Sequence, residues 1–168
     1  MAYLSFLKSR TGILKLLETI VGIITLALVV QYGIQVFQYQ DILTGSAFLL
    51  AVVAVGLVVS FIELVTFFYD DDTLYGVRKS LFEVMFCFVM TALWLAAACT
   101  MAYFVHTRLY EHYKSTNKQF DMYGGLIAAT VFAFVGAVLY LIDAILAYSD
   151  MKSTVNGGPR YFETVVYK

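Results

Sequence analysis

Four long apolar segments, separated by short polar ones, divide the chain. They cover residues 14–37, 46–69, 81–105 and 123–148. Each is close to the ~20 apolar residues that a helix needs to cross a hydrocarbon core about 30 Å thick. Because a backbone in lipid must satisfy its own hydrogen bonds, we expect each segment to be a helix. The pattern therefore predicts an all-α fold, a four-helix transmembrane bundle.

The polar segments set the expected domain limits and orientation. We expect an N-terminal tail over 1–13, a four-span domain over 14–148 and a C-terminal tail over 149–168. An excess of Lys and Arg near the spans marks the cytosolic side. Eight such residues fall on the side of the two tails: Lys8, Arg10, Lys15, Arg78, Lys79, Lys152, Arg160 and Lys168. Three fall on the other side: Arg108, Lys114 and Lys118. Both termini are therefore predicted to be cytosolic.

The composition supports a membrane protein and excludes one class of partner. Hydrophobic residues make up 61% of the chain and charged residues 14%, with a mean hydropathy of +0.81. A soluble domain of 168 residues does not bury that much apolar surface. The net charge of −1 comes without a basic run, so no nucleic-acid partner is expected.

Residue types that carry chemistry are sparse. Cys87 and Cys99 lie on one expected helix, about 18 Å apart along its axis, which is too far for a disulfide. His106 and His112 are six residues apart, a spacing that does not place two imidazoles on one helix face. No Ser/His/Asp set and no phosphate-binding glycine loop is present. We therefore predict no catalytic, cofactor-binding or metal-binding residues.

The fourth span contains a regular row of small residues. Gly125, Ala129, Ala133 and Ala137 follow one another at intervals of four. Helices in lipid lack a hydrophobic drive to associate, so close backbone approach at small residues matters more than it does in water. We expect this row to be a helix-packing face, either within the bundle or against a partner.

Each span also carries one acidic residue, at the end predicted to be cytosolic. Two of them have simple structural explanations. Glu83 fits a capping box that begins at Ser80. Glu18 follows Lys15 by three residues, so the two side chains are expected to pair near the start of the helix.

Glu63 and Asp143 are harder to explain. Each lies seven residues from the next acid outside its span, so roughly 10 Å deep. A charge at the helix centre costs about 2.5–3.5 kcal/mol on insertion scales. We interpret the two as polar contacts between helices, with hydrogen-bond donors among Tyr140, Tyr148, Thr66 and Tyr69. The alternative is an ion or proton path. We expect Lys and Arg to stay outside the spans, which leaves the acids as the charged groups within them.

Three stretches resemble the MARVEL-domain tetraspan family, which includes MAL, plasmolipin and the chemokine-like-factor-like MARVEL proteins. They are KLLETIVGIITLAL at 15–28, FVMTALWLAAACTMAY at 88–103 and AATVFAFVGAVLYLIDAILAY at 128–148. The resemblance implies a non-enzymatic protein that organises membrane domains, vesicle trafficking, or membrane apposition, fusion or junctions. It also implies that Glu18, Trp94 and Asp143 are bundle or partner contacts.

The resemblance further implies a location and partners. The expected location is the plasma membrane, trafficking vesicles or both. The expected partners are membrane lipids, with cholesterol as a candidate, and other membrane proteins or further copies of the chain. A second hypothesis from another class is a small ion- or proton-coupled transporter or channel subunit that uses Glu63 and Asp143.

Overall fold

The computed structural model describes residues 10–33, 40–69, 81–115 and 121–156, and all of its described elements are helical. The first long helix, α2 (Arg10–Leu28), continues into a π-helical turn, η1 (Val29–Gly33). The second is α3 (Gln40–Tyr69). The third, α5 (Leu81–Phe104), continues through a π-helical turn, η3 (Val105–Leu109), into α6 (Tyr110–Ser115). The fourth is α7 (Asp121–Asn156).

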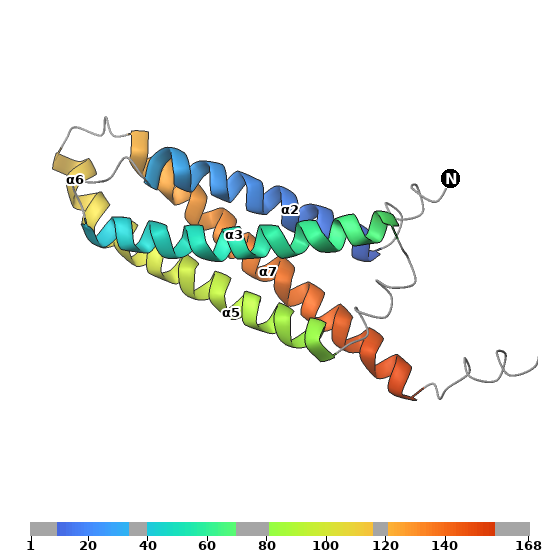
Figure 1. The fold of residues 1–168 in the computed structure, drawn as a ribbon. Helices are drawn as coiled ribbons and strands as arrows, with labels where there is room; N and C mark the ends of the chain where they lie inside the picture. The colour runs from blue at the N-terminus through green and yellow to red at the C-terminus, as the bar shows by residue number, and fades with distance from the viewer. Residues whose placement is uncertain (1–9, 34–39, 70–80, 116–120, 157–168) are drawn as a thin grey trace, which may run out of the picture.

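The four long helices form an antiparallel bundle (Figure 1). The principal contacts join α2 to α3, α3 to α5, α5 to α7 and α7 to α2, so the helices close into a ring. Helix α2 begins and α7 ends at the same end of the bundle, called here the terminal end. The opposite end, which carries η1, η3 and α6, is called the α6 end.

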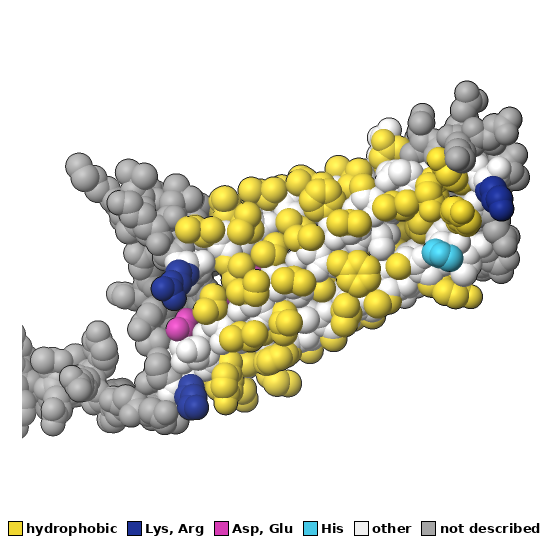
Figure 2. Space-filling view, turned by 180° about the vertical axis from the view of Figure 1, so that it is seen from behind, with side chains coloured by type: hydrophobic (Ala, Val, Ile, Leu, Met, Phe, Trp, Pro, Cys, Tyr) yellow, Lys and Arg dark blue, Asp and Glu magenta, His cyan; other side chains and the backbone are white. Residues whose placement is uncertain are grey.

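All four helices are long and apolar enough to cross a membrane, which confirms the predicted fold class. The candidate spans are Arg10–Gly33, Thr44–Val65, Leu81–Thr107 and Tyr123–Lys152. Hydrophobic side chains cover the visible face along the length of the bundle, and charged side chains gather at its two ends (Figure 2). This distribution is the one that a surface in contact with lipid requires.

The core combines two buried aromatic side chains, Trp94 and Tyr140, with aliphatic side chains, methionines and several alanines. Trp94 on α5 is almost fully buried and stacks at an angle on Tyr140 of α7, with 6.0 Å between the ring centroids. Gly136 makes room for this tryptophan, because a Cβ at that position would lie 2.5 Å from the Trp94 ring. Small residues at the interface thus bring α5 and α7 together.

A second glycine opens the centre of the bundle on the facing helix. A Cβ at Gly56 of α3 would lie 2.8 Å from the Tyr140 hydroxyl and 3.3 Å from Nε1 of Trp94. The absence of a side chain at Gly56 therefore lets Tyr140 reach across the bundle to α3. This reach places the hydroxyl group next to the polar cluster at the terminal end.

Candidate functional site

The terminal end of the bundle contains a lysine surrounded by four carboxylates. Lys15 of α2 is only 5% exposed. Its Nζ lies 2.6 Å from Oε2 of Glu63 on α3 and 2.7 Å from Oδ2 of Asp143 on α7. Glu18 on α2 and Glu83 on α5 each have a carboxylate oxygen 3.4 Å from the same nitrogen. One ammonium group therefore joins all four helices. We call these five residues the Lys15 cluster.

The order of the helices explains why the cluster forms. In an antiparallel bundle the start of α2, the end of α3, the start of α5 and the end of α7 all lie at the terminal end. Glu63 lies near the end of α3 and Glu83 near the start of α5. Asp143 lies in the second half of α7. Acids that are up to 125 positions apart in the sequence therefore meet at one depth.

Neutral polar groups surround the cluster on two sides. The Ser60 hydroxyl donates a hydrogen bond to Oε2 of Glu18 over 3.4 Å and shares a second one with the Tyr140 hydroxyl at 3.0 Å. On the other side the Cys87 thiol donates to Oδ2 of Asp143 at 3.4 Å and to Oε1 of Glu83 at 3.6 Å. These donors stabilise the carboxylates where water has little access.

The expectation that Lys and Arg stay outside the spans was wrong for Lys15. A long lysine side chain near a helix end usually extends toward the membrane surface. Here four carboxylates on all four helices attract the ammonium group inward instead. The signal in the sequence was one acid in every span at the same end of the bundle. Such a set favours a shared cation, and Lys15 is the basic residue next to it.

Some of the polar residues predicted to pair do so in the structure, and others have different partners or lie outside the described residues. The expected pair of Lys15 and Glu18 is present, but Lys15 lies nearer to Glu63 and Asp143. Glu83 also faces Lys15, while Ser80, its expected capping partner, lies outside the described residues. Of the four expected donors, Tyr140 reaches the cluster through Ser60. Tyr148 is half exposed, and the side chains of Thr66 and Tyr69 lie outside the described set.

The predicted packing residues lie inside the bundle. Ala129, Ala133 and Ala137 are buried, and Trp94 belongs to the core. Gly125 packs directly against the ring of Tyr32 in η1. These positions are inside the chain's own bundle. A role in contacting a separate partner stays a prediction for them.

By formal count the cluster holds three more acidic groups than basic ones, since four carboxylates surround one ammonium. Uncompensated charge in a dry site is unfavourable, so neutrality there requires protons or an added cation. Donor atoms of Glu83, Cys87 and Asp143 do lie within 4.8 Å of one another. The Lys15 ammonium, however, is already 2.7 Å from Asp143 and 3.4 Å from Glu83. The lysine thus already pairs with two of these three groups.

The buried charged side chains of the described bundle all lie at the terminal end. Beyond Tyr140 the centre is filled by apolar side chains: Met90, Trp94, Ala97, Ala98 and Met101. The Trp94 Nε1 atom is buried without a hydrogen-bond partner. Among the described residues, the buried hydroxyl groups beyond the cluster are those of Thr25, Ser46 and Thr130. They donate to the Val21 carbonyl, the Met101 sulfur and the Leu126 carbonyl and not to one another.

A comparison with protein families decides the class of the protein. Residues 6–146 match the model of the MARVEL family, described as a membrane-associating domain. The chain belongs to the MARVEL family. The resemblance inferred from the sequence is thereby confirmed. Neither the search of curated proteins nor the search of solved structures finds a match for this MARVEL protein.

Family and fold together establish a multi-pass, membrane-associated tetraspan protein. The match covers all four acids and Lys15, so the Lys15 cluster lies entirely within the MARVEL domain. The cluster is therefore a feature of the membrane-embedded domain itself and not of the tails.

Proposed function

We propose that this MARVEL protein is a non-enzymatic membrane scaffold, which organises membrane domains, vesicle trafficking or membrane apposition through lateral contacts of its helices. The observation that carries the proposal is the inward orientation of the charged groups. Lys15 and its four acids are directed into the bundle, whereas large apolar side chains are exposed on the outer surface of all four long helices. The surface that the domain offers to its surroundings is therefore suited to lipid and to other apolar helices. A scaffold of this kind acts through contacts of its surface and needs no binding site for a polar substrate.

The Lys15 cluster gives such a scaffold a fixed shape. Helices in a bilayer gain little from excluding apolar area. Apolar contacts alone therefore do little to prevent one helix of the bundle from sliding along or rotating against another. A single ammonium bound to carboxylates from all four helices removes that freedom. Each helix must keep its register, or a buried charge loses its partner. We propose in addition that both tails are cytosolic and that the protein resides in the plasma membrane or trafficking vesicles.

The test is lateral association in a defined membrane. The full-length protein, labelled with a donor or an acceptor dye, is reconstituted into giant vesicles at low protein density. We expect energy transfer above the level of randomly mixed monomers, and we expect Lys15→Met to reduce it because the bundle loses its fixed shape. The proposal fails if wild-type protein shows only random transfer at every density.

A second candidate function, a proton or cation path, is favoured by the excess of carboxylates in the cluster. Against it stands the apolar centre between Tyr140 and the α6 end. Liposomes that contain the protein separate the two functions. The scaffold predicts no proton or cation flux above that of empty liposomes. Flux that is lost in Glu63→Gln and Asp143→Asn would establish the transport function instead.

A further inference from the structure

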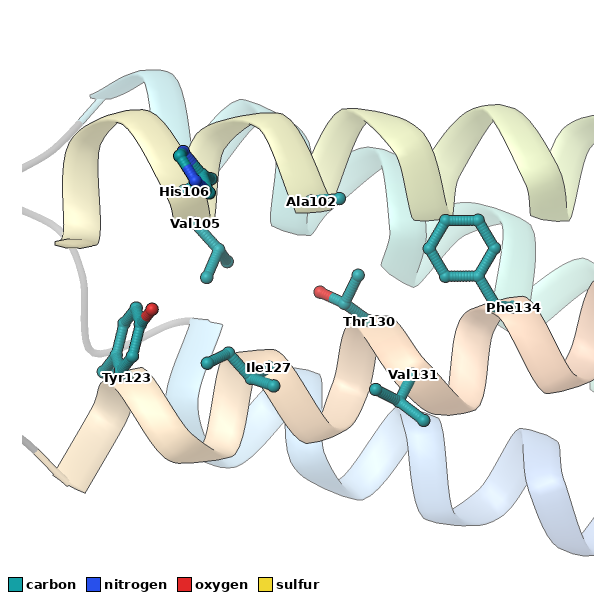
Figure 3. Close-up of a pocket in the computed structure, with 8 residues that line it drawn as sticks. All are labelled: Ala102, Val105, His106, Tyr123, Ile127, Thr130, Val131 and Phe134. Carbon is teal, nitrogen blue, oxygen red and sulfur yellow. The ribbon is translucent and has the colours of Figure 1, made fainter.

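An apolar groove lies between α5 and α7 near the α6 end, away from the Lys15 cluster (Figure 3). Its volume is about 240 Å³. Ala102 and Val105 line it from the α5 side, and Ile127, Val131 and Phe134 line it from α7. An apolar cavity of about 150 Å³ is enough to hold benzene, so this groove accommodates a longer piece of hydrocarbon.

The groove opens toward the lipid and not toward water. Both of its walls belong to membrane spans. On the α7 side, Ile127, Val131 and Phe134 are all exposed on the bundle surface. Inside the groove the Thr130 hydroxyl is already bonded to the Leu126 carbonyl at 2.8 Å. The Thr130 proton is therefore not available to a ligand, and the lining between Thr130 and Phe134 is otherwise apolar, which suits hydrocarbon.

The length of the groove matches one leaflet. Tyr123 and Phe134 line it near opposite ends and are eleven residues apart on α7, which is about 16 Å at 1.5 Å per residue. Half of a typical hydrocarbon core is about 15 Å. A chain lying in the groove would therefore run from the membrane surface at the α6 end to the middle of the bilayer.

The outer end of the groove is aromatic and polar. His106 and Tyr123 line it there. His106 stacks on Tyr110, with ring centroids 6.0 Å apart, and Tyr123 stacks on Tyr113 at 4.7 Å. Tyrosines that are polar at one end and apolar at the other gather at the depth of the lipid head groups. This cluster therefore places the outer end of the groove at head-group level.

The backbone at this end is also unusual. Val105 and His106 belong to the π-helical turn η3, and π-helical turns inside α-helices frequently occur at functional sites. Here the turn supplies one wall and the polar rim of the groove together. The turn and the groove thus share Val105 and His106.

We propose that this groove binds one acyl chain of a phospholipid from the leaflet at the α6 end. The chain lies along Ala102, Ile127 and Val131, and the head group rests against His106 and Tyr123. The groove is about as long as one leaflet is deep, and a flexible acyl chain can follow an apolar lining of that length between two helices. The site is separate from the Lys15 cluster and does not depend on the proposed scaffold function.

The experiment uses the full-length protein in phosphatidylcholine liposomes that contain a phosphatidylcholine with a photoactivatable acyl chain. After illumination, labelled residues are identified by mass spectrometry. We expect label to concentrate on the groove residues of α5 and α7. Ala102→Phe, which fills the groove, should reduce that label several-fold. The matched control is Ala96→Phe, at an exposed small residue of the same helix outside the groove, and it should leave the label unchanged.

A second pair guards against a folding defect in Ala102→Phe. Val131 and Val138 are both 55% exposed on α7, and only Val131 lines the groove. Val131→Trp should reduce groove labelling, while Val138→Trp should not. Label spread evenly over the exposed residues of all four helices would overturn the proposal. Capture of a photoactivatable sterol, but not of the phospholipid chain, at these residues would overturn it as well.

Discussion

At the scale of the residue, Lys15 determines the chemistry of the membrane-embedded domain. Its ammonium group lies within 3.4 Å of carboxylates on all four helices. Breaking a buried ion pair by removing one partner is strongly destabilising, because the other charge is left without compensation. The stability of the bundle should therefore depend more on this residue than on any exposed lysine.

Lys15→Met tests this directly, because it keeps the length of the side chain and removes the charge. We expect the free energy of unfolding to fall by about 3–5 kcal/mol, as for other broken buried ion pairs. Thermal unfolding in a mild detergent is the measurement. Lys152→Met, at an exposed lysine of α7, is the control. Equal midpoints for the two variants would contradict a structural role of Lys15.

Asp143→Leu should also insert into the membrane and yield a loosened bundle, because a buried partner of Lys15 is lost. Its effect should not add to that of Lys15→Met. Residues in one charge network show interaction energies of about 0.5–3 kcal/mol. The double variant is expected to be more stable than the sum of the single losses predicts, as measured by the same thermal unfolding. Strict additivity would mean that the two groups act independently.

At the scale of the element, the contact between α5 and α7 depends on a glycine that faces Trp94. Gly136→Ala would place a Cβ 2.5 Å from a buried ring. Overpacking of this kind costs about 1–3 kcal/mol. We therefore expect a lower unfolding midpoint in detergent for Gly136→Ala.

The control for Gly136→Ala lies on the same helix. A Cβ at Gly124 meets nothing within 4 Å, so Gly124→Ala should be neutral or stabilising by up to about 1 kcal/mol, the usual gain for alanine over glycine in a helix. A stability loss of equal size in both variants would contradict the role of the tryptophan contact, because alanine at the open Gly124 position meets no neighbour.

Hydropathy alone predicted the helices well but not their ends. The first span is expected from residue 14, but the described helix already includes Arg10; the second is expected from 46, but the described helix already includes Gln40. A polar residue next to a span remains helical because the backbone continues its hydrogen bonds beyond the lipid. The π-helical turns η1 and η3 had no counterpart in the hydrophobic pattern, since one extra residue in a turn hardly changes it.

At the scale of the whole molecule, we predict that the terminal end of the bundle faces the cytosol. Excess basic residues at the terminal end favour the cytosol. In cells expressing a Cys99→Ala background, a membrane-impermeant maleimide should label Lys114→Cys in intact cells. It should label Arg10→Cys and Lys152→Cys only after permeabilisation. All three positions are exposed, so the reverse pattern would place the terminal end outside.

The sequence by itself determined that the protein is a four-span helical membrane protein, because the requirement for apolar length and internal hydrogen bonds acts on each segment separately. It also identified the four acids, the small-residue row and the MARVEL family. Only the tertiary structure decided that Lys15 lies among Glu18, Glu63, Glu83 and Asp143, and that the α5–α7 groove exists. Both depend on how helices distant in the sequence rotate and pack against one another. Hydropathy carries no information about that rotation, because almost every side of these helices is apolar.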